Sequence, residues 1–172
     1  MPVTLETARL VLRPHVPSDL EQLIGCCADP DVYRFLAGRP FTREECWARL
    51  LRYVGHWTLF GWGMFAVLDR PSGRYIGDVG FANFERGITG IDGSPEAGWL
   101  IAAMAQGKGL ASEALAAATT WLDAQIDPPR TVCMIDLGNT ASHKVAAKAG
   151  YRESGRAKHG ESDVMLYVRI RR

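Results

Sequence analysis

The sequence lacks a long hydrophobic run. No segment approaches the ~18 consecutive apolar residues of a membrane-spanning helix. The first six residues, Met1 to Glu6, also contain no basic stretch followed by an apolar one, and a secretion signal would need both. We therefore expect a cytoplasmic protein without a membrane partner.

Cysteine and histidine are scarce and scattered. The four cysteines include no Cys-x-x-Cys pair, and the four histidines are too far apart for a metal-binding His-x-x-x-His helix. A disulfide framework or a zinc site would need a regular spacing of such residues. We therefore expect a reducing compartment and no metal.

An excess of charge of one sign is also missing. The sequence has 20 Lys and Arg against 19 Asp and Glu, which gives a formal net charge of +1. Proteins that bind nucleic acid through their backbone phosphates usually carry a basic excess. No nucleic-acid partner is therefore expected.

The composition is otherwise that of a folded globular protein. Hydrophobic residues make up 47% and charged residues 23% of 172 positions, which is close to average. This length suits one domain, which we predict to span residues 1–172. Glycine is in slight excess, with 18 residues against a usual share of ~7%, and several of these glycines lie near residue 107.

The first third of the chain predicts a strand followed by two helices. Residues 9–13 alternate as a strand does. The motif Ser18-x-x-Glu21 has the spacing of a capping box that begins a helix extending to Cys27. The motif Thr42-x-x-Glu45 has the same spacing and precedes apolar residues at helical intervals.

The rest of the chain predicts strands alternating with helices. The expected strands are residues 63–68, 75–81, 96–101, 131–135 and 164–170, and the expected helices are residues 109–125 and 139–148. This order is typical of an α/β domain with a mixed sheet.

A glycine-rich segment, Gln106–Glu113, connects an expected strand to an expected helix. Glycine lets a ligand approach the backbone closely, and the first amides of a helix are unpaired donors that bind phosphate. A tight turn without a ligand explains Gly107 and Gly109 equally well. Two nucleotide-binding motifs do not fit, because a P-loop would need glycine at Ala102 and a dinucleotide fingerprint would need it at Ser112.

Four motifs, taken in order, resemble those of the GNAT superfamily of acyl-CoA-dependent N-acyltransferases. They are Leu5–Arg13, Glu96–Leu100, the loop residues Gln106, Gly109 and Ala111, and Asn139–Ser142 with Lys148–Tyr151. Together they are similar to the branch that includes ribosomal-protein N-terminal acetyltransferases. The resemblance implies an α/β (α+β) fold with a mixed, mostly antiparallel central sheet of six to seven strands flanked by about four helices.

The resemblance also implies where acetyl-CoA binds. The backbone of Trp99, Leu100 and Ile101 would bind the pantetheine arm as a further strand would, and the loop amides would bind the pyrophosphate. The other implied cofactor-binding residues are Gln106, Gly107, Lys108, Gly109, Leu110, Ala111, Asn139 and Ser142. Asn139 is explained equally well as a helix N-cap, and Ser142 as an ordinary first-turn serine.

Acyl transfer to an amine needs a group that accepts a proton, because amines with a pKa of about 8 to 10 are mostly protonated at pH 7. Glu96 is the predicted catalytic base, acting directly or through water, although a carboxylate that only orients substrate or pairs with arginine fits this position equally well. Many family members have a tyrosine where this chain has Ala146. We therefore assign protonation of the departing thiolate to Ser142 or to water.

The resemblance thus implies an N-acetyltransferase that moves an acetyl group from acetyl-CoA to a primary amine by direct attack in a ternary complex. The acceptor would be a protein N-terminus or a small molecule, and Glu85, Asp92 and Glu96 favour a cationic one. The alternative is a non-catalytic acyl-CoA-binding or regulatory module with the same fold, which Ala146 favours. A homodimer is as compatible with the sequence as a monomer.

Overall fold

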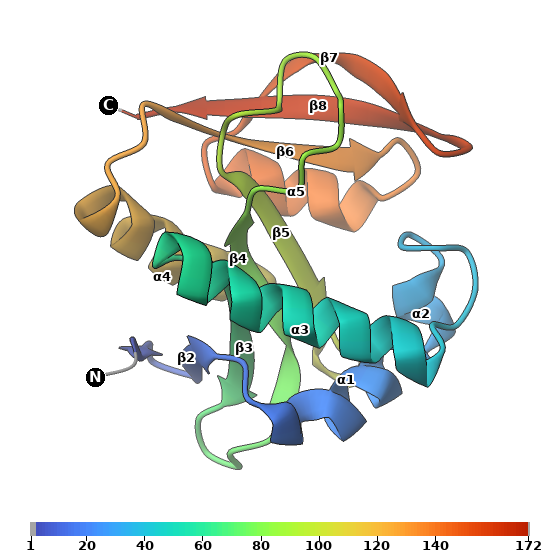
Figure 1. The fold of residues 1–172 in the computed structure, drawn as a ribbon, viewed down its shortest axis with the longest axis vertical. Coiled ribbons are helices and arrows are strands. Elements are labelled where there is room, and N and C mark those ends of the chain that lie inside the picture. Colours follow the sequence, from blue (N-terminus) through green and yellow to red (C-terminus); the bar gives the residue numbers. More distant parts are fainter. Residues whose placement is uncertain (1–2, 172) are drawn as a thin grey trace.

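The computed structural model describes residues 3–171, which form one eight-stranded sheet covered by helices on both faces (Figure 1). The strand order is β1-β2-β3-β4-β5-β6-β8-β7. The strands are β1 (Leu5–Glu6), β2 (Leu10–Pro14), β3 (Met64–Asp69), β4 (Tyr75–Ala82), β5 (Glu96–Ile101), β6 (Arg130–Asp136), β7 (Arg152–His159) and β8 (Ser162–Ile170). The helices are α1 (Leu20–Cys27), α2 (Pro30–Tyr33), α3 (Arg43–Phe60), α4 (Leu110–Gln125) and α5 (Thr140–Lys148), with short 3₁₀ turns at Pro17–Asp19 and Ala103–Ala105.

The mixed, mostly antiparallel sheet confirms the predicted fold class. The only parallel pair among the described residues joins β5 to β6. The sheet has eight strands rather than six to seven, and five helices rather than about four cover it. The additional elements are the two-residue β1, the four-residue α2 and the edge strand β7.

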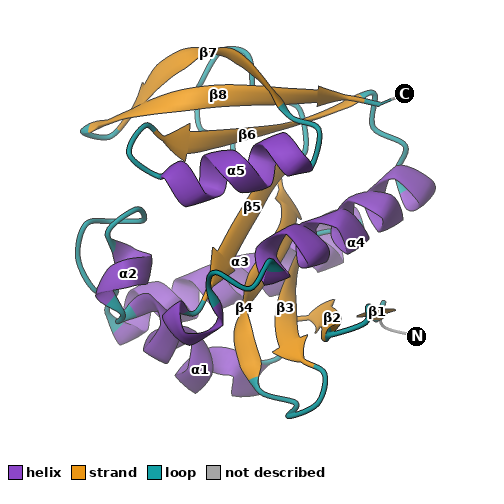
Figure 2. Cartoon of the chain, turned by 180° about the vertical axis from the view of Figure 1, so that it is seen from behind, coloured by secondary structure: helices purple, strands orange, loops and turns teal. Residues whose placement is uncertain are grey.

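Alternation along the strands sends side chains to two separate cores. Leu100 packs with Leu23 of α1 and Leu50 of α3 on one face. The neighbouring Ile101 packs with Leu115 of α4 on the other. Figure 2 shows α4 and α5 together on the face opposite α3, so the sheet has helices on both faces.

The two predicted capping boxes have different outcomes. The box before α3 is confirmed, because the Glu45 N–H donates to Thr42 Oγ1 over 3.2 Å and the Thr42 N–H donates to Glu45 Oε2 over 2.8 Å. The Ser18 box is wrong, since α1 begins at Leu20 after a 3₁₀ turn. Asp19 supports this turn by accepting the Val16 N–H over 2.9 Å.

The loop between β4 and β5 lies across the sheet formed by β6, β8 and β7. Ile91 of this loop is 2% exposed and packs on Val132 of β6 and Leu166 of β8. The same loop carries Phe84 and Arg86 past the first residue of β5. No helix among residues 3–171 is long and apolar enough to cross a bilayer.

Candidate active site

Strands β5 and β6 separate almost as soon as they meet. They share one pair, Glu96 with Val132, whereas β4 and β5 share six. The Ala102 N–H donates to the Ile76 carbonyl of β4 over 2.8 Å, so it points toward β4. Because backbone groups alternate in direction along an antiparallel strand, the N–H and C=O groups of Trp99 and Ile101 point into the gap toward β6.

This alternation corrects one predicted cofactor contact. The N–H and C=O groups of Leu100 point toward Asp78 of β4, its partner in the ladder, and its side chain is 5% exposed in the core beneath α1. Leu100 therefore presents no backbone group to the gap. The Ile101 carbonyl is also occupied, because Gln106 Nε2 donates to it over 2.9 Å. The free groups are the Trp99 N–H and C=O and the Ile101 N–H.

The loop after β5 turns the backbone amides of α4 outward. Gly107 and Gly109 both have left-handed backbone, with φ of +74° and +76°, a conformation that glycine adopts without strain. Within α4, the first N–H with a backbone acceptor is that of Glu113, which donates to the Gly109 carbonyl over 3.1 Å. The N–H groups of Leu110 and Ala111 therefore remain free, and with the positive end of the helix they fit a pyrophosphate.

The charged side chains beside this loop are already engaged. Lys108 Nζ folds back onto the Met104 carbonyl over 3.0 Å, while the Lys108 carbonyl accepts from Arg9 Nη1 over 2.9 Å. Arg9 is in turn bound to Glu113, whose pKa is lowered: burial would raise it, but hydrogen bonds from Thr7 and Arg9 outweigh burial. Backbone amides rather than free cations thus form this site.

Asn139 and Ser142 lie at the start of α5, across the gap from β5. Asn139 Oδ1 accepts the Ser142 N–H over 3.1 Å, which confirms Asn139 as the N-cap. The indole Nε1 of Trp99 donates to Ser142 Oγ over 3.0 Å. Ala146, one turn further along, is fully buried in the core. The structure therefore brings Trp99 and Ser142 together.

Glu96 lies at the closed end of the gap and is bound to an arginine. It is 6% exposed, and Arg86 Nε lies 2.8 Å from Glu96 Oε2 and 3.0 Å from Oε1. Arg86 Nη1 lies 3.1 Å from His159 Nε2 at the end of β7. Burial, and secondly the charge of Arg86, lower the pKa of His159, so the imidazole is neutral near pH 7. Both carboxylate oxygens of Glu96 are within hydrogen-bond distance of Arg86 Nε.

Arg86 and His159 were missed in the sequence because neither belongs to a motif. Arg86 lies in the glycine-rich loop before β5, and His159 ends a strand that the hydrophobic pattern did not predict. Nothing in the sequence of the β4–β5 loop or of β7 indicated that Arg86 and His159 lie close to Glu96. Among residues 3–171, no cluster of three His, Cys, Asp or Glu side chains is arranged to hold a metal.

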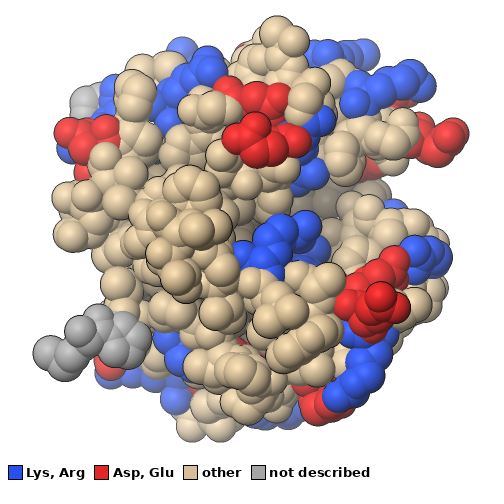
Figure 3. Space-filling view, in the orientation of Figure 1, with Lys and Arg blue, Asp and Glu red and all other residues tan. Residues whose placement is uncertain are grey.

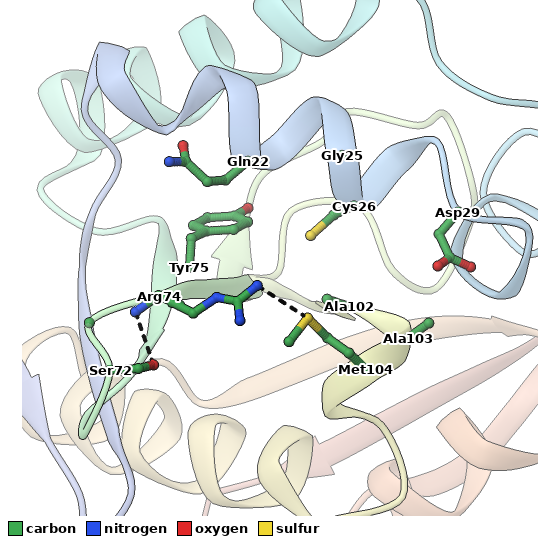
Figure 4. A pocket seen from close by; sticks show the side chains of 11 residues that line it. Gln22, Gly25, Cys26, Asp29, Ser72, Arg74, Tyr75, Ala102, Ala103 and Met104 are labelled. Atoms are coloured by element: carbon green, nitrogen blue, oxygen red, sulfur yellow. Dashed lines mark hydrogen bonds between the residues drawn. The ribbon is translucent and has the colours of Figure 1, made fainter.

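A cavity of about 540 Å³ lies at the opposite end of β5, between α1, the β3–β4 turn and the 3₁₀ turn after β5 (Figure 4). Cys26, Arg74 and Met104 are on its wall. Glu96 and Ile101 are five residues apart on an extended strand, a separation of roughly 17 Å. This cavity is therefore remote from Glu96.

Comparisons with known proteins agree with this arrangement. Residues 9–152 match the family model of the acetyltransferase (GNAT) domain. The chain is 24% identical to the uncharacterized N-acetyltransferase p20 of Bacillus licheniformis, over 98% of this chain and 97% of that protein. A solved structure from Bordetella pertussis, assigned to the GNAT family of acetyltransferases, is 31% identical with a TM-score of 0.88, over 98% of this chain and 99% of that one.

A further solved structure is that of a ribosomal L7/L12 α-N-protein acetyltransferase, RimL, in complex with coenzyme A. It is 18% identical with a TM-score of 0.78 and covers 98% of both chains. At this identity the likeness concerns the fold. The family match spans most of the chain and includes the divergence of β5 from β6, the loop and α5. The chain therefore belongs to the GNAT family of acetyltransferases.

Proposed function

We propose that this protein transfers the acetyl group of acetyl-CoA directly to a primary amine, in a complex that holds both substrates. The observation that carries the proposal is the free edge of β5 beside β6, which leads without interruption into the outward amides of α4. An unpaired strand edge with backbone donors, followed by a helix N-terminus, suits a long acyl carrier that ends in phosphates. We call the gap that this edge lines between β5 and β6 the slot. Acetyl-CoA supplies an acetyl group activated as a thioester.

The residues that would bind acetyl-CoA lie along the slot, from β5 to the loop before α4. The Trp99 C=O and the Ile101 N–H would bind the pantetheine arm. The pyrophosphate would lie on the amides of Gly107–Ala111, with Gln106 fixing the loop to β5 through the Ile101 carbonyl. Asn139 would face the arm from the start of α5.

Glu96 is the proposed proton acceptor for the amine. Its carboxylate is at the closed end of the slot, where β5 and β6 separate. Arg86 neutralises it in the resting protein, so the proton would pass to Glu96 through a water molecule or after Arg86 has moved. The Trp99 N–H is a fixed donor for negative charge on the reacting carbonyl oxygen.

Ser142 is the proposed proton donor on the sulfur side. An indole N–H can only donate, so in the contact with Trp99 the Ser142 oxygen accepts. The Ser142 hydroxyl proton is therefore free to be donated elsewhere. This arrangement supports a role for serine at the step for which other family members have a tyrosine.

The acceptor class is a protein N-terminus or a small-molecule amine. A measurement of free thiol released from acetyl-CoA, across peptides, polyamines, aminoglycosides and amino acid derivatives, tests the proposal. Release that depends on one of these amines supports it. Stabilisation of the fold by CoA, with no thiol release from any amine, would instead establish a non-catalytic acyl-CoA-binding module.

A further inference from the structure

Helix α3 carries a basic group, Arg52, that lies over the same aromatic ring as the arginine bound to Glu96. The guanidinium of Arg52 lies 5.4 Å from the ring centroid of Phe84, and that of Arg86 lies 4.4 Å from the same centroid. Arg86 in turn holds Glu96. Phe84 packs on Tyr53, Met64 and Ala82, and Ala82 is the ladder partner of Glu96. Phe84 and Arg86 therefore connect Arg52 to Glu96, the proposed base.

Helix α3 borders an open region of the surface. Figure 3 shows the molecule hollowed beside α3, with basic side chains along the rim of the hollow. Arg52, on α3, is itself exposed. An acceptor amine that reaches Glu96 from the α3 face would pass this side chain.

Arg52 differs from its neighbours in having no counter-charge. Among residues 3–171 no carboxylate lies within ion-pair distance of Arg52, whereas Arg86 is paired with Glu96 and Arg49 with Asp78. Burial, and then the nearby charges of Arg49 and Arg86, lower the pKa of Arg52 although Tyr53 acts in the opposite direction. The local field at Arg52 is therefore positive.

The acidic residues that suggested a cationic acceptor are engaged within the protein. Glu85 Oε1 accepts from Asn83 Nδ2 over 2.6 Å, and Asp92 Oδ1 accepts the Arg86 N–H over 3.2 Å. Glu96 is bound to Arg86. Each of the three carboxylates thus has a partner, whereas the Arg52 guanidinium contacts aromatic residues but no carboxylate among residues 3–171.

We propose that the acceptor is an amine that carries a carboxylate within a few bonds, and that Arg52 binds this carboxylate while the amine reaches Glu96. The inference rests on the proposed acetyl transfer and names its substrate class. Guanidinium and carboxylate form a charge-assisted, two-point contact, and the Phe84 ring holds the guanidinium in place through its face. A free amino acid derivative and an acidic peptide N-terminus share this chemistry.

The test compares amines that differ only in charge. The probes are C-terminally amidated hexapeptides beginning Ala-Glu, Ala-Gln or Ala-Lys, and the corresponding C-terminally amidated dipeptides. The Lys ε-amine is dimethylated in these probes, so that it keeps its charge but cannot itself be acetylated. The measurement is kcat/KM for thiol release at saturating acetyl-CoA. In the wild type we expect the Glu probe to exceed the Gln probe about tenfold, as one charge-assisted hydrogen bond would give, and the Lys probe to be poorest. Preference in the hexapeptides indicates a protein acceptor, and preference confined to the dipeptides indicates a small molecule.

Substitutions at Arg52 separate charge from shape. Arg52→Gln is expected to remove the preference for the Glu probe while leaving kcat/KM for the Gln probe within about twofold, and Arg52→Lys is expected to retain part of it. The control is Arg156→Gln, because Arg156 is another exposed arginine with no carboxylate of residues 3–171 within ion-pair distance. It lies on β7 next to Ala157, which packs toward the β4–β5 loop, so the Arg156 side chain faces the other side of the sheet. This control is expected to keep the preference.

Two failures are distinguishable. If no amine supports thiol release although CoA binds, the proposed acetyl transfer is wrong. If amines are acetylated but the wild type treats the three probes alike, favours Ala-Lys, or keeps its preference in Arg52→Gln, acetyl transfer stands and the assignment of Arg52 is overturned.

Discussion

The indole N–H of Trp99 donates to Oγ of Ser142 over 3.0 Å, which links the free edge of β5 to the first turn of α5. Trp99 also directs its own N–H and C=O into the gap between β5 and β6. One residue therefore lines the slot with its backbone and orients the serine across it with its side chain. In this contact the serine oxygen accepts, so the serine hydroxyl proton is left free to be donated elsewhere.

The Trp99–Ser142 contact predicts that the two residues act as a unit. Ser142→Ala is expected to lower kcat about 100-fold, the lower end of the usual range for loss of a proton donor. Trp99→Phe keeps an aromatic ring but removes the indole N–H, and is expected to lower kcat about fivefold, which is close to one hydrogen bond. The measurement is steady-state acetylation of the best acceptor from the amine screen.

The double variant is the control for this prediction. If Trp99 acts through Ser142, Trp99→Phe adds little once Ser142 is alanine. Two independent losses that multiply would show that the indole N–H has no effect on the serine. Unchanged kcat in Ser142→Ala would remove Ser142 from the reaction.

Glu96 predicts a pH-dependent defect. Glu96→Gln removes the base, so the rate at pH 7 is expected to fall about 100-fold. At pH above 9 an α-amine with an ordinary pKa near 8 is already neutral, and the defect should shrink. The measurement is the ratio of wild-type to variant kcat/KM from pH 6.5 to 9.5.

The control for Glu96 is Glu85→Gln, which alters an exposed carboxylate of the adjoining loop that Asn83 holds. Its ratio to the wild type should not vary with pH. A constant ratio for Glu96→Gln over the same range would mean that Glu96 only anchors Arg86.

Gly107 predicts the location of the pyrophosphate. A Cβ at Gly107 meets nothing within 4 Å, whereas a Cβ at Gly109 lies 3.8 Å from Arg9 Nη2, which would pair with an introduced carboxylate. Gly107→Asp should therefore weaken CoA binding at least tenfold by calorimetry. Gly107→Asn has the same shape and the same tolerance of left-handed backbone, and should bind CoA more tightly than Gly107→Asp. Equal affinity of the two variants would exclude phosphate from this loop.

Short sequence motifs predicted an element correctly where contacts between neighbouring residues determine its structure. The Thr42 box needs only residues three positions apart, and it is present. The Ser18 box has the same spacing and is absent, because Asp19 lies between Arg13 and the Val16 N–H, and these contacts fix the turn before α1. Strand β7 carries mostly exposed polar residues, so it has no hydrophobic alternation to reveal it.

The same limit applies to the site. The sequence located Trp99, Ser142 and Glu96 because family motifs are continuous segments. The motif also grouped Leu100 with Trp99 as a backbone contact to the cofactor. A motif does not specify the register with β4, and this register determines in which direction each backbone group points. Arg52 comes from a helix outside every motif, and only the packing of α3 on Phe84 brings it to the site.

Asp19 predicts how stability depends on pH. Burial would raise its pKa, but hydrogen bonds from Arg13 and the Val16 N–H lower the pKa below its ordinary value. The folded protein therefore favours the ionised carboxylate, and the resulting stability is present above about pH 4 and is lost as pH falls through the folded pKa. Asp19→Asn should lower the free energy of unfolding by about 2 kcal/mol at pH 7, as measured by urea denaturation. At pH 3 the difference in free energy of unfolding between variant and wild type should be smaller.

The control is Asp31→Asn, which alters an exposed pair with Arg34. This pair is worth at most about 1 kcal/mol, so the free energy of unfolding should change little at either pH. A difference for Asp19→Asn that stays constant from pH 7 to pH 3 would show that the Asp19 charge does not stabilise the fold.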